Sequence, residues 1–518
     1  MTETKNYIGI TIGPIFDMMS LVSTPAALWA TSYMFSMISK KTCEKLYEKK
    51  AEIISPFYDN PDNELFNKND GIGLFHDRII IKKSSNITLD EVNTIREEVL
   101  KEVSLSFNLK EDELIKRVLY IAAEIETNKE ENPILKGGKI LDSLELSRKI
   151  VFTETSNAIL SAFTGALISD KDDMRLSKNS KIKDFAKEML DTKKWSLLKK
   201  DGDIKNLSDI AGPSKISGMK KHNYYAIVRS DGDNMSKIIE RLPLNESTDE
   251  DGKKTLTFTS FSKTCLEYCS EVAECVKKFD GVPVYSSGDD LLAIMPCDAG
   301  EKGTVFDFVK EVNETFAKMF DPFIKMIKDV NEGKPDDKKI AVPSLSFGIS
   351  ICFKKFPLYE ALEDSATLLF GIAKSKKNCM AVRLQKHSGQ SVGLLIYNDV
   401  LDDFLKIQKT TLKKADSASE ILLSALYKTE QFSRLFLKAE GKQIKYLFEN
   451  TFDAPDHKDN DFVHEDLPEF YKNIKEKKRF LALSQENFED EENDITVFNF
   501  TMRMLKFFVE KAGKDGKK

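Results

Sequence analysis

Cysteine and histidine are scarce in this chain of 518 residues, which contains seven cysteines and five histidines. No two cysteines have the C-x-x-C spacing of a zinc ribbon or a redox pair, so we expect no zinc. Cys265, Cys269 and Cys275 fall within one expected helix that has no histidine beside it. We interpret them as reduced core residues, which indicates a cytoplasmic protein.

Long uninterrupted apolar runs are also absent, even in the almost uncharged N-terminal segment. From Asn6 to Ser39 the only charged residue is Asp17, and Gly13-Pro14 interrupts this segment. No run approaches the ~18 apolar residues that identify a membrane-spanning helix. The segment therefore predicts a buried strand, YIGITI, followed by a buried helix from Pro25 to Lys49, with no membrane span.

The chain has no excess of positive charge, because its formal net charge is -6. With 41% hydrophobic and 31% charged residues it has a globular composition, and its length suggests three or four domains. Contacts with nucleic acid would have to use local lysine-rich segments, such as residues 199–205 and 215–221. A solvated linker is the alternative for these segments.

Hydrophobic patterning divides the chain into four regions, 1–85, 86–221, 222–390 and 391–518. The first region starts with the strand and helix above and ends in an expected strand, GLFHDRIIIKK. In the second, apolar residues recur at every third or fourth position in IREEVLKEVSLSF and ELIKRVLYIAAEI, which predicts helices. The third alternates as β-α-β-β-α-β with one extra strand, which is the ferredoxin-like pattern. The fourth region again predicts helices.

Aspartates follow two expected strands of the third region. Asp231 and Asp233 follow YYAIVRS, and Asp289 and Asp290 lie at the tip of the hairpin VYSSGDDLLAIMP. In a ferredoxin-like sheet the first strand and the central hairpin are neighbours, so these carboxylates should converge. Their repulsion implies bound cations, and two Mg²⁺ (or Mn²⁺) ions could activate a ribose hydroxyl and stabilise leaving pyrophosphate. The alternative is plain turn chemistry, since Ser-Ser-Gly-Asp also suits a turn.

Each residue of this constellation receives an expected role. Asp231, Asp289 and Asp290 are the predicted catalytic residues, and all four aspartates are predicted metal ligands. Lys374 and Lys377, just before the last strand, should hold phosphates as point charges, although isolated lysines are usually only solvated. The remaining predicted nucleotide-binding residues are Gly232, Ser287 and Gly288.

Two other acidic motifs predict no catalysis. His76-Asp77 is the doublet of metal-dependent HD phosphohydrolases, but no histidine precedes it and the next is His222. We interpret the doublet as a pair of strand residues and expect no nuclease activity. Asp201 to Asp203 repeats the D-G-D pattern, but it follows two lysines instead of an apolar strand and predicts a turn.

Together these motifs resemble the large Palm-domain subunit of type III CRISPR effector complexes, closest to the type III-B (Cmr) form. IGPIFDMMSLVSTPAALWATSYMFS is similar to the family's first Palm domain, and SDGDNMSK with the hairpin is similar to its second. FPLYEALEDSA, AKSKKN and the HSG at residues 387–389 follow in the family's order. The resemblance covers most of the chain.

The resemblance implies an α+β protein with two ferredoxin-like Palm domains and a helical domain after each. Residues 1–85, with possible additions from later segments, would form a degenerate first Palm, because Gly13-Pro14 stands where the second has Asp231. Residues 86–221 would form a helical domain and linker, 222–390 the catalytic Palm and 391–518 a C-terminal helical domain. Target RNA would activate this Palm to convert ATP into a cyclic oligoadenylate, with guide RNA and other Cmr-type subunits as partners.

Three departures from the family pattern leave alternatives open. Many relatives carry an N-terminal HD nuclease domain, whereas this sequence begins at the first Palm, and many carry a cysteine-rich element where residues 86–221 have no cysteine. Ser287 replaces the first glycine of the family's Gly-Gly-Asp-Asp tip, which would cost about 1 kcal/mol if the position required a positive φ. Family members without the HD domain also suggest joining AMP to S-adenosylmethionine. A scaffold without catalysis is the remaining alternative.

Overall fold

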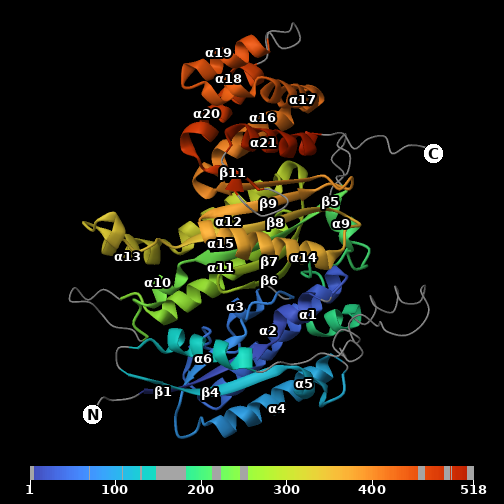
Figure 1. Cartoon of the computed structure of the whole chain (residues 1–518). Coiled ribbons are helices and arrows are strands. Elements are labelled where there is room, and N and C mark those ends of the chain that lie inside the picture. The colour runs from blue at the N-terminus through green and yellow to red at the C-terminus, as the bar shows by residue number, and fades with distance from the viewer. Residues whose placement is uncertain are drawn as a thin grey trace.

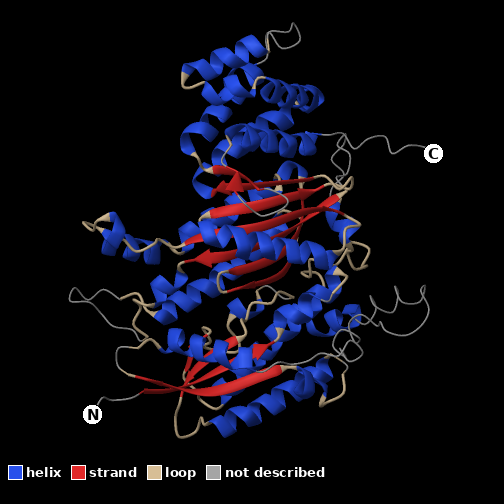
Figure 2. Ribbon diagram, in the orientation of Figure 1, coloured by secondary structure: helices blue, strands red, loops and turns tan. Residues whose placement is uncertain are grey.

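The computed structural model describes residues 5–20, 22–68, 71–107, 109–128, 131–147, 182–212, 223–244, 255–452, 461–483, 490–491 and 493–509. These residues form two β-sheets with helices packed around them (Figure 2). The first sheet lies at one end of an elongated molecule, the second lies in the middle, and a group of C-terminal helices lies at the other end (Figure 1). The α+β class with two ferredoxin-like sheets is confirmed.

The first sheet has four antiparallel strands in the order β2-β3-β1-β4. This is the ferredoxin-like order, with the first strand in the centre beside the third and the fourth. The prediction of a helix across ELIKRVLYIAAEI was wrong, because β4 pairs with β1 over nine residues. The first sheet therefore extends beyond residue 85, as the possible addition of later segments allowed. Its strands are β1 (Lys5–Gly13), β2 (Ile53–Ser55), β3 (Arg78–Lys82) and β4 (Leu119–Thr127).

Helix α2 (Pro25–Glu48) explains the charge-free N-terminal segment. Thr24 caps its start by accepting a hydrogen bond from the Ala27 N–H at 3.2 Å, and Pro25 suits the first turn. Most of its side chains are buried, because it packs between the first sheet and the edge strand β6 (Val282–Ser287) of the second. A helix buried on more than one side has no surface on which to place charges. The predicted buried helix is confirmed.

The second sheet has eight strands in the order β12-β11-β10-β9-β8-β5-β7-β6. Its four-stranded part, β8-β5-β7-β6, is antiparallel and repeats the order of the first sheet. β9 joins β8 in parallel and is the predicted extra strand. The other strands of this sheet are β5 (Tyr224–Asp233), β7 (Asp290–Pro296), β8 (Ser344–Phe353), β9 (Cys379–Gln385), β10 (Ser391–Tyr397), β11 (Phe480–Leu483) and β12 (Asp490–Glu491).

The sequence predicted only helices after residue 390, but this region also contains strands. β10 pairs with β9 over seven residues and β11 pairs with β10, so both extend the second sheet. Their apolar runs, SVGLLIY and FLAL, are short and buried on both faces, and such runs carry no helix or strand period. The helical segment of the third region that follows β7 is divided in two, since α12 ends at Met319 and α13 begins at Asp321.

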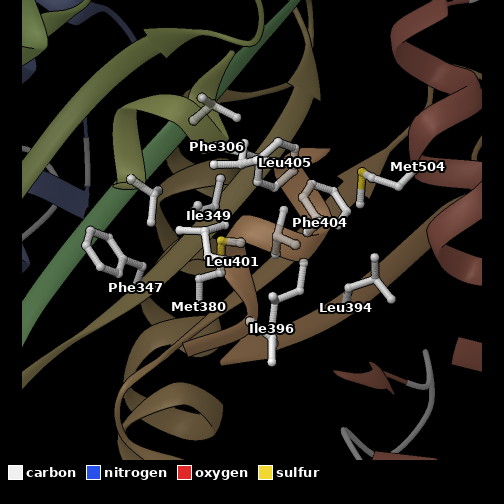
Figure 3. Close-up of a cluster of buried hydrophobic side chains, with 14 of the residues drawn as sticks. Phe306, Phe347, Ile349, Met380, Leu394, Ile396, Leu401, Phe404, Leu405 and Met504 are labelled. Atoms are coloured by element: carbon white, nitrogen blue, oxygen red, sulfur yellow. The ribbon is translucent and has the colours of Figure 1, made fainter. Parts of the chain in front are cut away.

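The largest hydrophobic core joins the second sheet to the C-terminal helices (Figure 3). Phe306 of α12 (Val305–Met319) packs edge-on against Phe404 of α16 (Leu401–Lys413), with ring centroids 4.7 Å apart. Phe347 and Ile349 of β8, with Met380 of β9, supply the sheet side of this core. The C-terminal helices are therefore part of the fold of the second Palm and not an appended module.

The remaining helices surround these layers. In the N-terminal half they are α1 (Ile15–Ser20), α3 (Glu64–Asn67), α4 (Leu89–Ser106), α5 (Glu113–Arg117), α6 (Pro133–Ser147), α9 (Leu207–Ala211), α10 (Met235–Ile239) and α11 (Phe258–Lys278). The later ones are α13 (Asp321–Asn331), α14 (Leu358–Ala366), α15 (Lys374–Lys376), α17 (Ala415–Gln431), α18 (Ser433–Lys438), α19 (Lys442–Thr451), α20 (Leu467–Lys477) and α21 (Asp494–Val509). None of the helices in the described ranges is long and apolar enough to cross a membrane.

Candidate functional site

Three carboxylates converge at one edge of the second sheet. β5 pairs with β7 from Tyr225 to Ser230, which carries the end of β5 to the tip of the β6-β7 hairpin. There Asp231, Asp289 and Asp290 each offer a carboxylate oxygen within 4.8 Å of the other two. Register in a sheet therefore produces the juxtaposition that the sequence predicted for these three residues.

Two glycines make this convergence possible. A Cβ atom at Gly232 would lie 2.2 Å from Oδ2 of Asp289, so any side chain at this position would displace that carboxylate. Gly288 has φ +67° at the hairpin tip, in the left-handed region that favours glycine, and a Cβ there would meet open space. Ser287 lies within β6 and has no positive φ, so serine costs no backbone strain there.

Two of these carboxylates, Asp289 and Asp290, have raised pKa values. Burial, and next the negative charge of Asp231, raise the pKa of Asp289 from 3.8 to about 7. Burial and the charges of Asp289 and Asp231 raise the pKa of Asp290 well above its usual range. Without a bound cation the cluster therefore retains protons near neutral pH. Such a site favours binding of a metal ion, because the ion can take the place of these protons in balancing the negative charge of the carboxylates.

Lys374 is the cation that faces this cluster. Its Nζ lies 2.9 Å from Oδ2 of Asp231 and 3.3 Å from Oδ1 of Asp233, and it donates a hydrogen bond to the Gly232 carbonyl at 2.6 Å. One ammonium offsets only part of the charge of several carboxylates. The sequence predicted that Lys374 lies beside phosphates, which stays a prediction; in the structure its ammonium lies beside Asp231 and Asp233.

Asp233 was predicted as a metal ligand, which stays a prediction, and its carboxylate has other partners in this structure. Its side chain is buried and lies outside the group of three convergent carboxylates. Its Oδ2 accepts hydrogen bonds from Ser344 Oγ (2.9 Å), Ser346 Oγ (2.8 Å) and the Asn378 N–H (2.9 Å). These hydrogen bonds connect β5 to β8 and to the turn at Asn378, and so fix the position of β5 next to Asp231.

Lys377 and Asn378 form a strained turn behind the site. Lys377 has φ +62° and ψ 158°, and Asn378 has φ +51°, conformations that non-glycine residues rarely adopt. The turn lets the Lys377 N–H donate to the Ala373 carbonyl at 2.7 Å and the Asn378 N–H donate to Asp233. Lys377 Nζ donates to Oδ1 of Asn234 at 2.6 Å, away from the three carboxylates.

Two cavities open beside the β6-β7 hairpin, between the first and second Palm domains. One, of about 220 Å³, reaches between α10 and α11 and is lined by Gly288, Asp289 and apolar residues such as Phe261. The other, of about 110 Å³, lies against α1 and α2 and includes Phe16 and Tyr285. The residues shared by both linings are Phe75, His76, Ser287 and Asp290.

His76 and Asp77 are functional candidates that the sequence interpretation missed. We predicted strand residues, but β3 begins after them at Arg78, and both line the smaller cavity opposite Asp290. Burial raises the pKa of Asp77, and no ion pair with it is found among the described residues. The only sequence signal was the doublet itself, since the hairpin that it faces lies some two hundred residues later.

A comparison with protein families identifies this part of the chain. Residues 224–381 match the family described as "Cas10/Cmr2, second palm domain". These residues form a Cas10-type Palm domain. The match runs from β5 to β9 and contains the three carboxylates, both lysines and the hairpin. The resemblance to type III CRISPR subunits is thus confirmed.

One curated relative is the CRISPR system Cmr subunit Cmr2 of Pyrococcus furiosus. It is 28% identical over 183 residues, which are 32% of this chain and 19% of that protein. The aligned segment is therefore about one fifth of the length of this relative.

Solved structures share the fold over almost the whole chain. A type III-B Cmr-beta complex in the apo state contains a chain with a TM-score of 0.57 and 13% identity, covering 97% of this chain and 82% of that one. The Cmr-beta complex bound to cognate target RNA gives a TM-score of 0.58 at 12% identity, covering 97% and 83%. A Csm1-Csm4 cassette in complex with cA4 gives 0.52 at 13% identity, covering 98% and 70%. At these identities the likeness shows the fold alone.

Proposed function

We propose that this protein is a metal-dependent nucleotidyltransferase that uses ATP, releases pyrophosphate and forms an oligoadenylate messenger. The observation that carries the proposal is the convergence of Asp231, Asp289 and Asp290 at the tip of a Cas10-type hairpin. Related folds support the substrate, since Csm1-Csm4 cassettes have been solved with ATP and with cA4.

The carboxylates fit Mg²⁺ by the chemistry of their donors. Mg²⁺ prefers hard oxygen ligands, and here carboxylate oxygens from three residues lie within 4.8 Å of one another. Burial and the charge of neighbouring carboxylates raise the pKa values of Asp289 and Asp290, and the charge of Lys374 lowers them only in part. Bound Mg²⁺ would supply activation of the attacking hydroxyl and stabilisation of the leaving pyrophosphate. Mn²⁺ would satisfy the same ligands.

In the proposed reaction a hydroxyl oxygen of the acceptor attacks the α-phosphorus of ATP. A new phosphorus–oxygen bond forms and the bond between the α-phosphorus and the α,β-bridging oxygen breaks. Pyrophosphate leaves with that electron pair, and the hydroxyl proton is released to water. Asp231 and Asp289 would hold the metal, and Asp290 would complete the site or orient the hydroxyl. Gly288 and Ser287 would lie against the nucleotide, Gly232 would leave room for Asp289, and Lys374 and Lys377 would attract phosphate oxygens.

An alternative acceptor is S-adenosylmethionine, to which the same site would transfer AMP. The smaller cavity favours it, because Asp77 and Asp290 line that cavity and its lining within the described part of the chain includes no lysine or arginine. A sulfonium cation is better accommodated there than a second triphosphate.

We further propose that the protein works inside a type III-B effector complex in the cytoplasm, with guide RNA and other Cmr-type subunits, and that target RNA activates it. The structural neighbours from Cmr-beta complexes, one of them bound to target RNA, support these partners. The lysines expected to contact RNA at 215–221 lie outside the described residues. Lys199 forms an ion pair with Asp209 at 3.0 Å, so it is the less available candidate.

The test uses an Asp289→Ala/Asp290→Ala double variant in the assembled complex. We expect it to lose Mg²⁺-dependent pyrophosphate release while it still assembles with RNA and partner subunits. The matched control is Asp201→Ala/Asp203→Ala, which removes the same charge from an exposed D-G-D turn. Mass spectrometry of the products from ATP, with and without S-adenosylmethionine, would identify the acceptor. Unchanged turnover in the double variant would leave the scaffold alternative standing.

A further inference from the structure

His76 lies where the two cavities meet. It is one of the few residues that line both, together with Ser287 and Asp290 of the catalytic hairpin. If one cavity holds the nucleotide that is attacked and the other holds the acceptor, the reacting phosphorus must lie at their common wall. His76 approaches this wall from the first Palm, and the carboxylates approach it from the second.

The backbone on both sides of His76 is firmly held. The Phe75 N–H donates to Ser36 Oγ at 2.9 Å, and the Asp77 carbonyl accepts from the Ile12 N–H at 3.0 Å. The Gly73 carbonyl accepts from the Ser286 N–H of the catalytic hairpin at 3.1 Å. This segment is thus fixed to the first Palm and to β6 at once, which preorganises the imidazole relative to the hairpin.

The hydrogen bonds of His76 define what its ring can do. The Arg78 N–H donates to Nδ1 of His76 at 3.3 Å, so in the neutral ring the proton is on Nε2. Burial, and next the charge of Arg78, lower the pKa of His76 to about 4, so the ring is neutral at physiological pH. Nε2 has no partner among the residues that the structure describes. A neutral ring of this tautomer is a hydrogen-bond donor and not a general base.

We propose that His76 is a catalytic residue that donates its Nε2–H to a phosphate oxygen at the junction of the two cavities. This inference rests on the proposed nucleotidyl transfer. The donor would stabilise negative charge that develops on the attacked phosphate, and the ring would neither gain nor lose a proton. Ser287 Oγ, which is buried and has no hydrogen-bond partner among the described residues, offers a second neutral group at the same wall.

Three substitutions separate this role from a structural one. His76→Gln places an amide N–H near the position of Nε2 but does not reproduce Nδ1. His76→Asn keeps an acceptor near Nδ1 for the Arg78 N–H but cannot reach the cavity. His76→Phe keeps the ring volume and loses both groups. All three are compared in the full chain, in the assembly in which the unaltered protein releases pyrophosphate.

We expect kcat to fall by about 10²-fold in His76→Phe and His76→Asn, as for the loss of one oxyanion donor, with His76→Gln recovering most of it. ATP carrying sulfur at one α-phosphate position should slow the unaltered protein and have a much smaller further effect on His76→Phe. Binding of Mn²⁺ should stay unchanged in all three. The thermal unfolding midpoint should fall slightly in His76→Gln and His76→Phe, which lose the acceptor of the Arg78 N–H, and stay unchanged in His76→Asn.

The opposite pattern, with Asn active and Gln inactive, would overturn the proposal and assign His76 to the Arg78 turn. Equal activity of all three variants would also overturn it. Failure of the proposed function looks different, because the unaltered protein would then release no pyrophosphate from ATP.

Discussion

The two sheets of this protein share one strand order and differ at the ends of their first strands. β1 ends in Gly13-Pro14, with no carboxylate, whereas β5 ends in Asp231-Gly232-Asp233. The second sheet has a hairpin tip with two aspartates beside this end, and the first sheet offers His76 and Asp77 from the segment before β3. Each fold thus brings the end of its first strand next to other segments at one edge of the sheet. The side chains at that edge determine whether it can bind a metal ion.

The comparison also concerns what the first Palm contributes, since its β1 ends at Gly13-Pro14 without the aspartates of β5. The first Palm nevertheless closes the cavities over the catalytic hairpin, and its core is continuous with one face of the second sheet. The proposed site is therefore composite, with metal ligands from one Palm and neutral or acidic wall residues from the other.

The largest expected effect comes from removing Asp231, the carboxylate that β5 contributes to the group of three. Asp231→Asn keeps the shape of the side chain and should lower the rate of pyrophosphate release by about 10³-fold or more, because both a metal ligand and the Lys374 partner are lost. Asp17→Asn, the same change near the end of β1, should have no effect. Equal rates of pyrophosphate release in the two variants would contradict the prediction that only the second sheet carries the reaction.

A second prediction concerns the glycine between the two aspartates of β5. In Gly232→Ala the new Cβ would lie 2.2 Å from Oδ2 of Asp289, so that carboxylate must move and the rate should fall by roughly 10- to 100-fold. Gly13→Ala is the matched control, since its Cβ would meet only the Ile15 nitrogen at 3.8 Å. Mn²⁺ affinity, measured by electron paramagnetic resonance, should fall only in the first variant.

The third prediction is a pH dependence of stability that belongs to the second sheet. The folded-state pKa of Asp289, about 7, lies above the ordinary 3.8, so the stability linked to its protonation is complete below pH ~4. It is lost as the pH rises through 7. Asp289→Asn should therefore stabilise the metal-free protein at pH 8 by on the order of 1–2 kcal/mol, and by much less at pH 4.

Thermal unfolding midpoints at the two pH values would measure this difference. Added Mg²⁺ should reduce it at pH 8, because the metal stabilises only the protein that keeps its carboxylates. A variant that is equally stabilised at both pH values would show that Asp289 carries no excess charge in the folded protein.

The smallest predicted effect is on the free energy of unfolding, at the contact between the two Palm domains. The Phe57 N–H donates to Ser262 Oγ of α11 at 2.8 Å, so Ser262→Ala leaves that N–H without its partner and should cost about 1 kcal/mol. Thr259→Ala, one turn earlier on the same helix and exposed, should be near neutral. Chemical denaturation of the full chain would compare them, and a neutral Ser262→Ala would mean that this hydrogen bond does not hold the joint.

Much of the fold and part of the site followed from local sequence. A strand that ends in Asp-Gly-Asp and a hairpin with Asp-Asp at its tip were recognisable from apolar runs and turn residues. Their convergence followed from the fixed neighbours of a ferredoxin-like sheet, and the buried helix α2 followed from an absence of charge. These are short-range patterns, or consequences of a strand order that few alternatives satisfy.

Other features were decided only by the tertiary structure. β4 and β10 became strands because long-range partners, β1 and β9, paired with runs whose own pattern fits a helix as well. Asp233 and Asp231 are two positions apart on one strand, yet one is buried among hydroxyl donors and the other faces the hairpin. His76 lines both cavities beside the hairpin because one Palm packs on the other. Local sequence specifies which side chains are available, and contacts between distant segments determine which of them share a cavity, because only those contacts fix register, burial and charge together.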